Sequence, residues 1–316
     1  MSTTVLQTQN LTKYYGSLTA VKELNLEIQR GEIFGLLGPN GAGKTTSINL
    51  MCGLLKPDAG RVFIHGKAVN GGDAEIRSRV GVCPQNTILW GKLTCLEQLE
   101  FIGEMYGVPR KKARQYGQEL LEVMGLSEKR NRLASTLSGG MQRRLNIILA
   151  LVHDPDILVL DEPEAGLDPQ SRVLVREYIR KWAAQRDRTV ILTTHNMDEA
   201  DRMAGRVAIL DHGELLVLDT PEALKRKVGE GDVLEIDLDG DQGLPLQKGL
   251  EAILKLAPQT SLVGRTLVIR AKAAVDLLTP ITETLRTAGF QPGEIRLREN
   301  TLEDVFIALT GRRLRD

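Results

Sequence analysis

One stretch decides how the rest of this sequence is interpreted: Gly38-Pro39-Asn40-Gly41-Ala42-Gly43-Lys44-Thr45, followed by Thr46. It has the form G-x-x-x-x-G-K-[ST], in which glycines let backbone N–H groups approach phosphate oxygens closely. An apolar strand is predicted before it, at 33–37, and a helix after it, beginning near Lys44. This context predicts a loop that binds ATP, with Lys44 reaching the β- and γ-phosphates and Thr45 offering its hydroxyl to Mg²⁺.

Composition and charge limit the classes of protein to which the chain can belong. Its 316 residues are 42% hydrophobic and 26% charged, which allows a substantial core. A chain of this length is expected to form about two domains. The 41 basic and 41 acidic residues cancel, so there is no broad positive field of the kind that draws proteins onto nucleic acid. We therefore expect no nucleic-acid function.

Cysteine spacing and the length of the hydrophobic runs bear on the cellular compartment. Cys52, Cys83 and Cys95 lie far apart and form no C-x-x-C pair, so they are expected to be reduced, buried thiols. No basic segment leads into an apolar stretch at the N-terminus, and the apolar runs at 145–152 and 157–160 are too short to cross a bilayer. We expect a cytoplasmic protein, so any membrane partner must be a separate chain.

Continuous apolar runs predict the central strands of a parallel sheet. The runs at 33–37, 157–160 and 190–192 have the length and composition of strands that helices cover on both faces. The first two-thirds of the chain is therefore predicted to be α/β. Between about residues 87 and 137 the hydrophobic spacing becomes helical, which predicts a helical insertion in this core.

A second domain is predicted after a charged, glycine-rich linker at 225–232. The elements expected beyond it are strands at 233–238 and 267–270 and helices at 246–256 and 274–287. We therefore divide the chain into a first domain at 1–228 and a small α+β domain at 230–316.

An acidic pair, Asp161 and Glu162, directly follows the apolar run 157–160. The carboxyl ends of parallel strands are where open α/β sheets bind ligands. Alone, such a pair is more often a solvated strand end, but the phosphate loop favours catalysis. Asp161 is expected to associate with Mg²⁺, and Glu162 to act as the base that polarises the attacking water.

The motif Ser138-Gly139-Gly140 precedes another predicted helix. Ser138 would cap this helix, and the two glycines would let a phosphate approach its N-terminus. A capped helix with a flexible entry explains the same residues when they are taken alone. Because the motif lies between the phosphate loop and the acidic pair, however, it resembles the signature sequence of ATP-binding-cassette (ABC) ATPases.

The resemblance covers about the first 225 residues and includes four further positions. Tyr15 resembles the aromatic residue that stacks on adenine, although a tyrosine before a turn is also compatible with surface packing. Gln85 resembles the glutamine that contacts metal and water and connects the core to the helical insertion. Asp168 resembles the acid that meets the opposing subunit, and His195 resembles the switch histidine that contacts the γ-phosphate.

The resemblance implies a P-loop NTPase fold of the ABC type with a helical subdomain at about 87–137. It also implies that two cassettes bind head to tail, as a homodimer or as a paired ABC subunit. Each ATP, with its Mg²⁺, would then lie between the phosphate loop of one copy and the residues Ser138, Gly139 and Gly140 of the other. Glu162, Gln85, Lys44 and His195 would serve hydrolysis.

Three classes of ABC ATPase can be compared with this sequence. Chromosome-maintenance and DNA-repair ATPases carry a long coiled coil between the phosphate loop and the signature, for which this chain has no room. Translation-associated factors carry two cassettes in one chain, whereas this chain has one of each motif. The remaining class is the motor subunit of a transporter, located on the cytoplasmic face of the membrane through a separate permease.

The tail at 300–311 resembles the ending of exporter ATPases of the daunorubicin-resistance type, a branch that serves drugs, lipids and polysaccharides. By itself it predicts a helix that Thr301 caps, with Asp304 reaching back, and that ends at Gly311. The alternatives to an exporter are the motor of an importer and a soluble regulatory ABC ATPase without transport. The cargo is not encoded here, because the permease forms the passage.

One position departs from the family pattern. Glu164 stands where Thr or Ser is usual, two residues after the expected base. It is expected either to change the electrostatics of the site or to face solvent. We predict that Glu162→Gln abolishes hydrolysis and retains ATP binding, whereas Glu164→Gln stays active.

Overall fold

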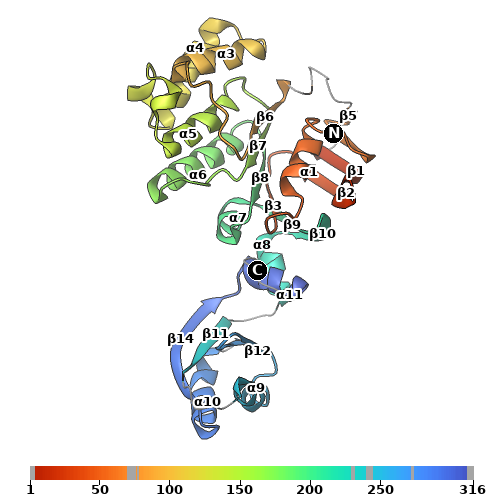
Figure 1. The fold of residues 1–316 in the computed structure, drawn as a ribbon, viewed down its shortest axis with the longest axis vertical. Helices are drawn as coiled ribbons and strands as arrows, with labels where there is room; N and C mark the ends of the chain where they lie inside the picture. The colour runs from red at the N-terminus through yellow and green to blue at the C-terminus, as the bar shows by residue number, and fades with distance from the viewer. Residues whose placement is uncertain are drawn as a thin grey trace. The chain divides into compact units, whose positions relative to one another are not determined.

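The computed structural model describes residues 4–69, 76, 78–228, 232–239, 245–271 and 274–311. Tertiary contacts divide the chain into two units, one ending at Thr220 and the other beginning at Pro221 (Figure 1). The expected linker contributes to helix α8, Pro221–Val228, which belongs to the second unit. Residues 229–231 of this linker lie outside the described residues.

The first unit is built on a six-stranded sheet in the order β10-β9-β3-β8-β7-β6. All neighbours pair in parallel except β9 and β10, which form an antiparallel hairpin. The strands are β3 (Ile33–Leu37), β6 (Val80–Cys83), β7 (Ile157–Asp161), β8 (Thr189–Thr194), β9 (Arg206–Asp211) and β10 (Glu214–Asp219). Every residue of β7 and β8 is buried, which confirms the predicted α/β core.

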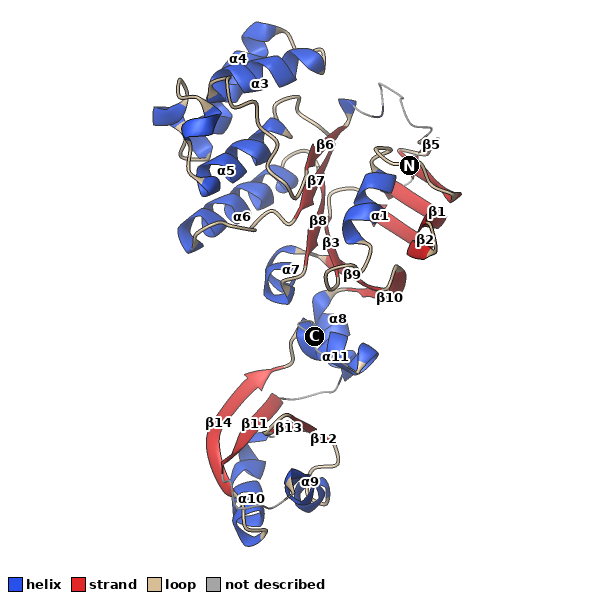
Figure 2. Ribbon diagram, in the orientation of Figure 1, coloured by secondary structure: helices blue, strands red, loops and turns tan. Residues whose placement is uncertain are grey.

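Alternation along the central strands assigns their side chains to two different cores. Leu158 and Leu160 of β7 pack in one core with helices α3 to α6, whereas Ile157 and Val159 pack in the other with α1. Figure 2 shows these helices on opposite sides of the sheet. The helices are α1 (Lys44–Met51), α3 (Cys95–Met105), α4 (Arg110–Val123), α5 (Gly139–Leu149), α6 (Pro169–Ala184) and α7 (Met197–Met203).

A second, antiparallel sheet of the first unit covers α1, in the order β2-β1-β4-β5. Its strands are β1 (Thr4–Tyr15), β2 (Leu18–Gln29), β4 (Ala59–Ile64) and β5 (Lys67–Ala68). Of these four strands, the alternation of apolar and polar residues at 24–29 predicts only the second half of β2. The helical insertion begins as expected, because Thr94 and Glu97 form both bonds of a capping box at the start of α3.

The second unit has a four-stranded antiparallel sheet in the order β12-β13-β11-β14. Its elements after α8 are β11 (Asp232–Asp239), α9 (Leu246–Leu254), β12 (Thr260–Val263), β13 (Thr266–Ala271), α10 (Ala274–Thr287), β14 (Gln291–Glu299) and α11 (Leu302–Thr310). This is the predicted small α+β fold. Thr301 and Asp304 form a capping box at the start of α11, and Gly311 ends the helix with a left-handed backbone.

Two simpler expectations can be compared with the structure. Cys52, Cys83 and Cys95 are buried free thiols, as predicted. Among the described residues, no helix combines the length and the apolar character needed to cross a bilayer.

Candidate functional site

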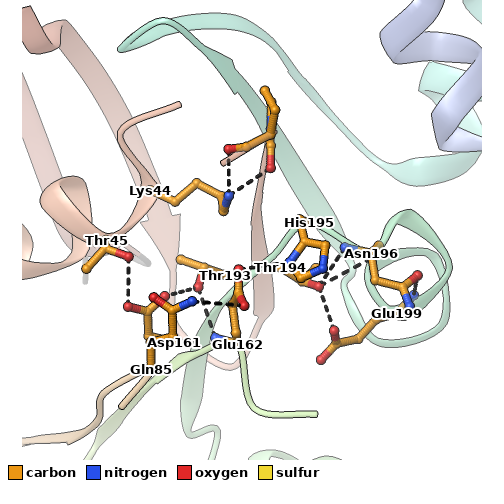
Figure 3. A network of polar contacts seen from close by, with 12 residues as sticks. Lys44, Thr45, Gln85, Asp161, Glu162, Thr193, Thr194, His195, Asn196 and Glu199 are labelled. Carbon is orange, nitrogen blue, oxygen red and sulfur yellow. Dashed lines mark hydrogen bonds and ion pairs between the residues drawn. The ribbon is translucent and has the colours of Figure 1, made fainter. Parts of the chain in front are cut away.

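The phosphate loop and the acidic pair meet at the carboxyl edge of the six-stranded sheet. Because β3, β7 and β8 are parallel, the residues that follow them emerge at the same edge. β3 leads into the loop at 38–43, β7 ends in Asp161, and β8 leads to His195. Figure 3 shows the side chains from these three strand ends turned toward one another.

Two glycines of the loop are required by the neighbouring backbone. A Cβ on Gly38 would lie 2.3 Å from the carbonyl oxygen of Leu210, and one on Gly43 would lie 2.3 Å from that of Ala20. Gly43 is also the left-handed N-cap of α1, and it provides no side-chain cap. The described first turn of α1 carries no acidic residue, so its N–H groups are suited to an anion.

Lys44 lies folded over the loop that it follows. Its Nζ donates to the carbonyl oxygens of Gly38 and Pro39, at 2.8 and 2.9 Å. Burial lowers the pKa of Lys44, and the nearby carboxylates of Glu162 and Asp161 oppose that shift. A phosphate in the loop would supply the negative charge that favours the ammonium form.

Asp161 and Glu162 are each held by two polar side chains. Asp161 accepts a hydrogen bond from the hydroxyl of Thr45 at 2.9 Å and another from the hydroxyl of Thr193. One carboxylate oxygen of Glu162 lies 2.9 Å from Nδ1 of His195, and the other accepts from the amide of Gln85 at 3.2 Å. Five of the six expected catalytic and metal-associated side chains therefore share one network, which Thr193 connects (Figure 3). The sixth, Lys44, bonds to the loop carbonyls instead.

The backbone at Glu162 has an uncommon conformation. Its φ of 50° lies in the left-handed region, which non-glycine residues adopt with strain. The backbone N–H of Glu162 donates to both the carbonyl oxygen and the hydroxyl of Thr193, at 3.1 Å each. These bonds anchor the residue to the end of β8 while its side chain turns toward Gln85 and His195.

The chemistry of the donors fits a magnesium ion. Thr45, Asp161 and Gln85 offer hydroxyl, carboxylate and amide oxygens, which hard cations prefer. Magnesium sites of this kind use one or two carboxylates and complete the coordination with phosphates and water. In the described part of the chain, no group of three or more His, Cys, Asp and Glu residues is arranged to hold a metal.

A cavity of about 560 Å³ opens beside the loop. The expected residues that line it are Tyr15, Asn40, Gly41, Gly43, Lys44, Thr45, Thr46, Gln85 and Glu162. Pro39 bonds to Lys44 as described above, and Ala42 is buried behind the loop. Tyr15 is 51% exposed, so its ring is accessible to a stacking partner.

Part of the cavity wall was not predicted. Leu18, Thr19 and Ala20 at the start of β2, and His212 in the β9–β10 turn, also line it. They reach the loop because the backbones of Ala20, Gly43 and Gly213 lie in close contact. No motif marks these residues, since their place depends on contacts between distant segments.

The signature residues and Asp168 do not line this cavity. Ser138 caps α5 by accepting from the N–H of Met141, and Ser138 and Gly139 are exposed. A Cβ on Gly140 would lie 3.9 Å from a carboxylate oxygen of Asp168. Asp168 in turn caps α6. These residues therefore form a separate surface of the first unit, and the chain alone does not complete the expected site.

The structure corrects one alternative for Glu164. This residue is 6% exposed and does not face solvent. Its carboxylate accepts two hydrogen bonds from the guanidinium of Arg176, at 2.9 and 2.8 Å. The charge that replaces the usual Thr or Ser is therefore neutralised within the protein.

Glu199 is a further buried acid that sequence reasoning missed. It lies in α7 and accepts from the hydroxyl of Thr194 at 2.6 Å, next to His195. Burial raises the pKa of Glu199 to about 7; the bond from Thr194 and the charge of Arg176 lower it, and Glu164 and Glu162 raise it. The sequence at the start of α7, Asn196 to Glu199, is that of an ordinary capped helix and does not indicate that Glu199 is buried.

Comparisons with known proteins agree with the geometry. The family model described as ABC transporter matches residues 21–165. The Nod factor export ATP-binding protein I of Ralstonia nicotianae is 39% identical over 316 residues, covering 100% of this chain and 96% of the relative. The linearmycin resistance ATP-binding protein LnrL of Bacillus subtilis (strain 168) is 34% identical over 316 residues, covering 99% and 100%.

Solved structures resemble about two-thirds of the chain. One, an ATP-binding subunit of an ABC transporter, has a TM-score of 0.66 and 27% identity, and the match covers 71% of this chain and 93% of that one. Another is a dimeric ATP-binding cassette in a post-hydrolysis state bound to ADP and Pi. Its TM-score is 0.64 and its identity 28%, with coverage of 68% and 98%.

Proposed function

This chain belongs to the ABC transporter ATPases, and from that membership we propose that it is the ATP-hydrolysing motor subunit of an exporter with a separate permease. The observation that carries the proposal is the length of the match to proteins named for export or resistance. It extends through the second unit, covering 100% of this chain in one relative and 99% in the other. A shared cassette alone would have matched only the first unit.

The polar network supports a role for each residue in hydrolysis. The loop N–H groups and Lys44 hold the phosphates, and Tyr15 stacks on the adenine. Glu162 accepts the proton of a water that attacks the γ-phosphorus, so that a new P–O bond forms while the β–γ bridge breaks and ADP leaves. Gln85 and His195 hold Glu162 from both sides in the structure, which keeps the carboxylate oriented.

The proposed mechanism includes a magnesium ion beside the phosphates. Thr45, Gln85 and Asp161 would hold it beside the phosphates, and when bound it would neutralise their charge. The bond from Thr45 to Asp161 already holds the hydroxyl and the carboxylate together.

A second cassette completes the site in this proposal. Ser138, Gly139, Gly140 and Asp168 form a surface apart from the nucleotide cavity, as expected if they contact the ATP of an opposing copy. ATP would then join two chains, and hydrolysis would release them.

We also propose that residues 1–228 form the nucleotide-binding domain and 230–316 an accessory domain, with the dimer on the cytoplasmic face of the membrane through its permease.

ATP-dependent dimerisation tests the shared site. The full-length Glu162→Gln variant should be monomeric with ADP and dimeric with ATP in light scattering, because ATP is bound but not cleaved. Adding Ser138→Arg should prevent the dimer without preventing ATP binding to each chain. A monomer under every nucleotide condition, or a wild-type rate per chain that does not change with dilution, would contradict it.

The transport role needs a different experiment. We expect the full chain, purified from detergent-solubilised membranes of its own host, to bring an integral membrane protein with it and to hydrolyse ATP faster in that complex. Purification without a membrane protein, with an ATPase regulated by a soluble protein, would favour the non-transport alternative. ATP-driven movement of cargo toward the cassette side in reconstituted vesicles would favour the importer.

A further inference from the structure

Arg143, near the start of α5, has an unusual environment for a cation. It is 3% exposed, and within the described part of the chain it forms no salt bridge with an acid. Its guanidinium instead donates to five backbone carbonyl oxygens. These belong to Pro84 (2.5 Å), Gln85 (3.1 Å), Asp161 (2.5 Å), Glu162 (2.9 Å) and Pro163 (3.4 Å).

The five bonds use the full donor capacity of the side chain. Arginine has five N–H groups in a rigid planar fork, and each one here has a carbonyl partner. Two of the carbonyls belong to the loop after β6 that carries Gln85. The other three belong to the end of β7 that carries Glu162. Arg143 therefore ties together the two segments that supply the catalytic base and its amide partner.

A second residue of α5, Asn146, also binds the segment around Gln85. Asn146 lies three positions after Arg143, on the same helix face. Its side-chain oxygen accepts from the N–H of Ile88 at 3.3 Å, and its amide donates to the sulfur of Cys83 at 3.2 Å. The loop around Gln85 is thus fixed to α5 at both ends.

The hydrogen bonds of Arg143 also hold the strained backbone at Glu162. A φ of 50° persists only where surrounding contacts hold it. Arg143 binds the carbonyl oxygen on each side of this residue's Cα, at Asp161 and at Glu162 itself, while Thr193 binds its N–H. The direction in which the carboxylate points therefore depends on Arg143.

We propose that Arg143 is a positioning residue that couples the signature helix to the catalytic carboxylate of the same chain. Ser138 caps the helix in which Arg143 lies, and the bonds of Arg143 connect this helix to the Gln85 loop and to Glu162. Under the proposed function, Ser138 contacts the ATP of the opposing copy. Occupation of one ATP site is then transmitted through Arg143 to the base of the other.

The variants Arg143→Gln and Arg143→Lys in the full chain test this. Gln has two N–H donors and Lys has three on a flexible stem, so neither reproduces the planar fork that binds both segments. We expect kcat to fall about 100-fold, as for an angstrom-scale displacement of a catalytic group. The Kd for ADP should stay within about 3-fold, because the nucleotide cavity does not include Arg143. The Hill coefficient for ATP should fall to about 1, because the two ATP sites are no longer coupled.

A matched control separates positioning from stability. Arg188 is also buried, at 8% exposed, but it binds Asp154 and stacks over Trp182, away from the site. Arg188→Gln should lower the Tm while leaving kcat and the Hill coefficient of the folded protein unchanged. All rates are normalised to the folded fraction, and Arg143→Lys, which keeps a charge and most of the volume, provides a folded variant if Arg143→Gln does not fold.

Each outcome has a clear meaning. A kcat within about 3-fold of wild type in either folded Arg143 variant would overturn the inference, as would an equal loss of kcat in Arg188→Gln. A loss of ADP affinity in proportion to kcat would also overturn it, because it would indicate damage to the nucleotide cavity. If wild-type protein neither hydrolyses ATP nor dimerises, the proposed function fails instead, and the two failures are therefore distinguishable.

Discussion

Two buried acids, one in each unit, have very different partners. Glu162 in the first unit contacts the amide of Gln85 and the imidazole of His195, and Lys44 of the same site bonds to loop carbonyls. Asp304 in the second unit accepts from the guanidinium groups of both Arg298 and Arg270, at 2.6 to 3.1 Å. Arg298 also binds Glu235. The arginines of the second unit neutralise the charge of Asp304 within the protein. No arginine side chain binds the carboxylate of Glu162 in the described part of the chain, so a bound ligand can supply the compensating charges.

The pKa of Asp304 reflects its charged partners. Burial alone would raise the pKa of Asp304, but the bonds from Arg298 and Thr301 lower it to about 2. A carboxylate held this firmly stabilises the fold and is poorly suited to exchange protons. We therefore assign stability to the cluster around Asp304 and chemistry to the cluster around Glu162.

The largest expected effect is on hydrolysis. Glu162→Gln keeps the shape of the side chain and removes the proton acceptor, so the rate should fall by about 10²- to 10⁴-fold in a phosphate-release assay. ATP affinity, measured by calorimetry, should be retained. The matched control is Glu164→Gln, which should remain active because Glu164 binds Arg176 instead of the reacting groups. A dead Glu164→Gln beside a live Glu162→Gln would reverse the assignment.

The next effect concerns stability in the second unit. Asp304→Asn would leave two partly exposed guanidinium groups without their shared buried anion, which costs about 3 kcal/mol, the lower end of the range for breaking a buried ion pair. Hydrogen exchange should report faster opening of β11, β14 and α11, with β7 and β8 unchanged. The control Asp276→Asn alters an exposed acid of α10 and should change exchange little. Equal exchange rates for the two variants would show that the cluster around Asp304 does not stabilise this unit.

Glu164 offers a smaller and purely structural test within the first unit. Glu164→Gln should lower the free energy of unfolding by about 1–3 kcal/mol, because Arg176 is left partly unpaired at low exposure. Combining it with Arg176→Met should restore part of that loss, since no charge then remains buried. Denaturant unfolding of the four members of this cycle measures the coupling, and strictly additive losses would exclude it.

The smallest expected effect depends on pH. The pKa of Glu199, about 7 when folded against 4.5 as the reference, means that the fold penalises the charged form. The penalty is absent below pH 4.5, grows as the pH rises and is complete above about pH 7. Glu199→Gln keeps an acceptor for Thr194, so it should raise the Tm at pH 8 and leave it nearly unchanged at pH 4. An equal change at pH 4 and pH 8 would show that Glu199 does not titrate between these two pH values.

Local sequence determined the parts of the site that depend on neighbouring residues. The glycines of 38–43 set the backbone of the phosphate loop, and helix starts at Thr94, Ser138 and Thr301 follow from side chains that bond within three positions. The meeting of Asp161 with this loop was predictable as well, because parallel strands deliver their ends to one edge.

Only the tertiary structure decided which charges are neutralised and what fixes the catalytic carboxylate. Arg143 reaches Glu162, and Arg176 reaches Glu164, across contacts between elements far apart in the chain. His212 joins the cavity in the same way. These pairings have no short-range pattern, since they depend on how helices and strands pack. The sequence by itself thus located the proposed ATP site, and packing decided which of the acids beside it is neutralised by an arginine.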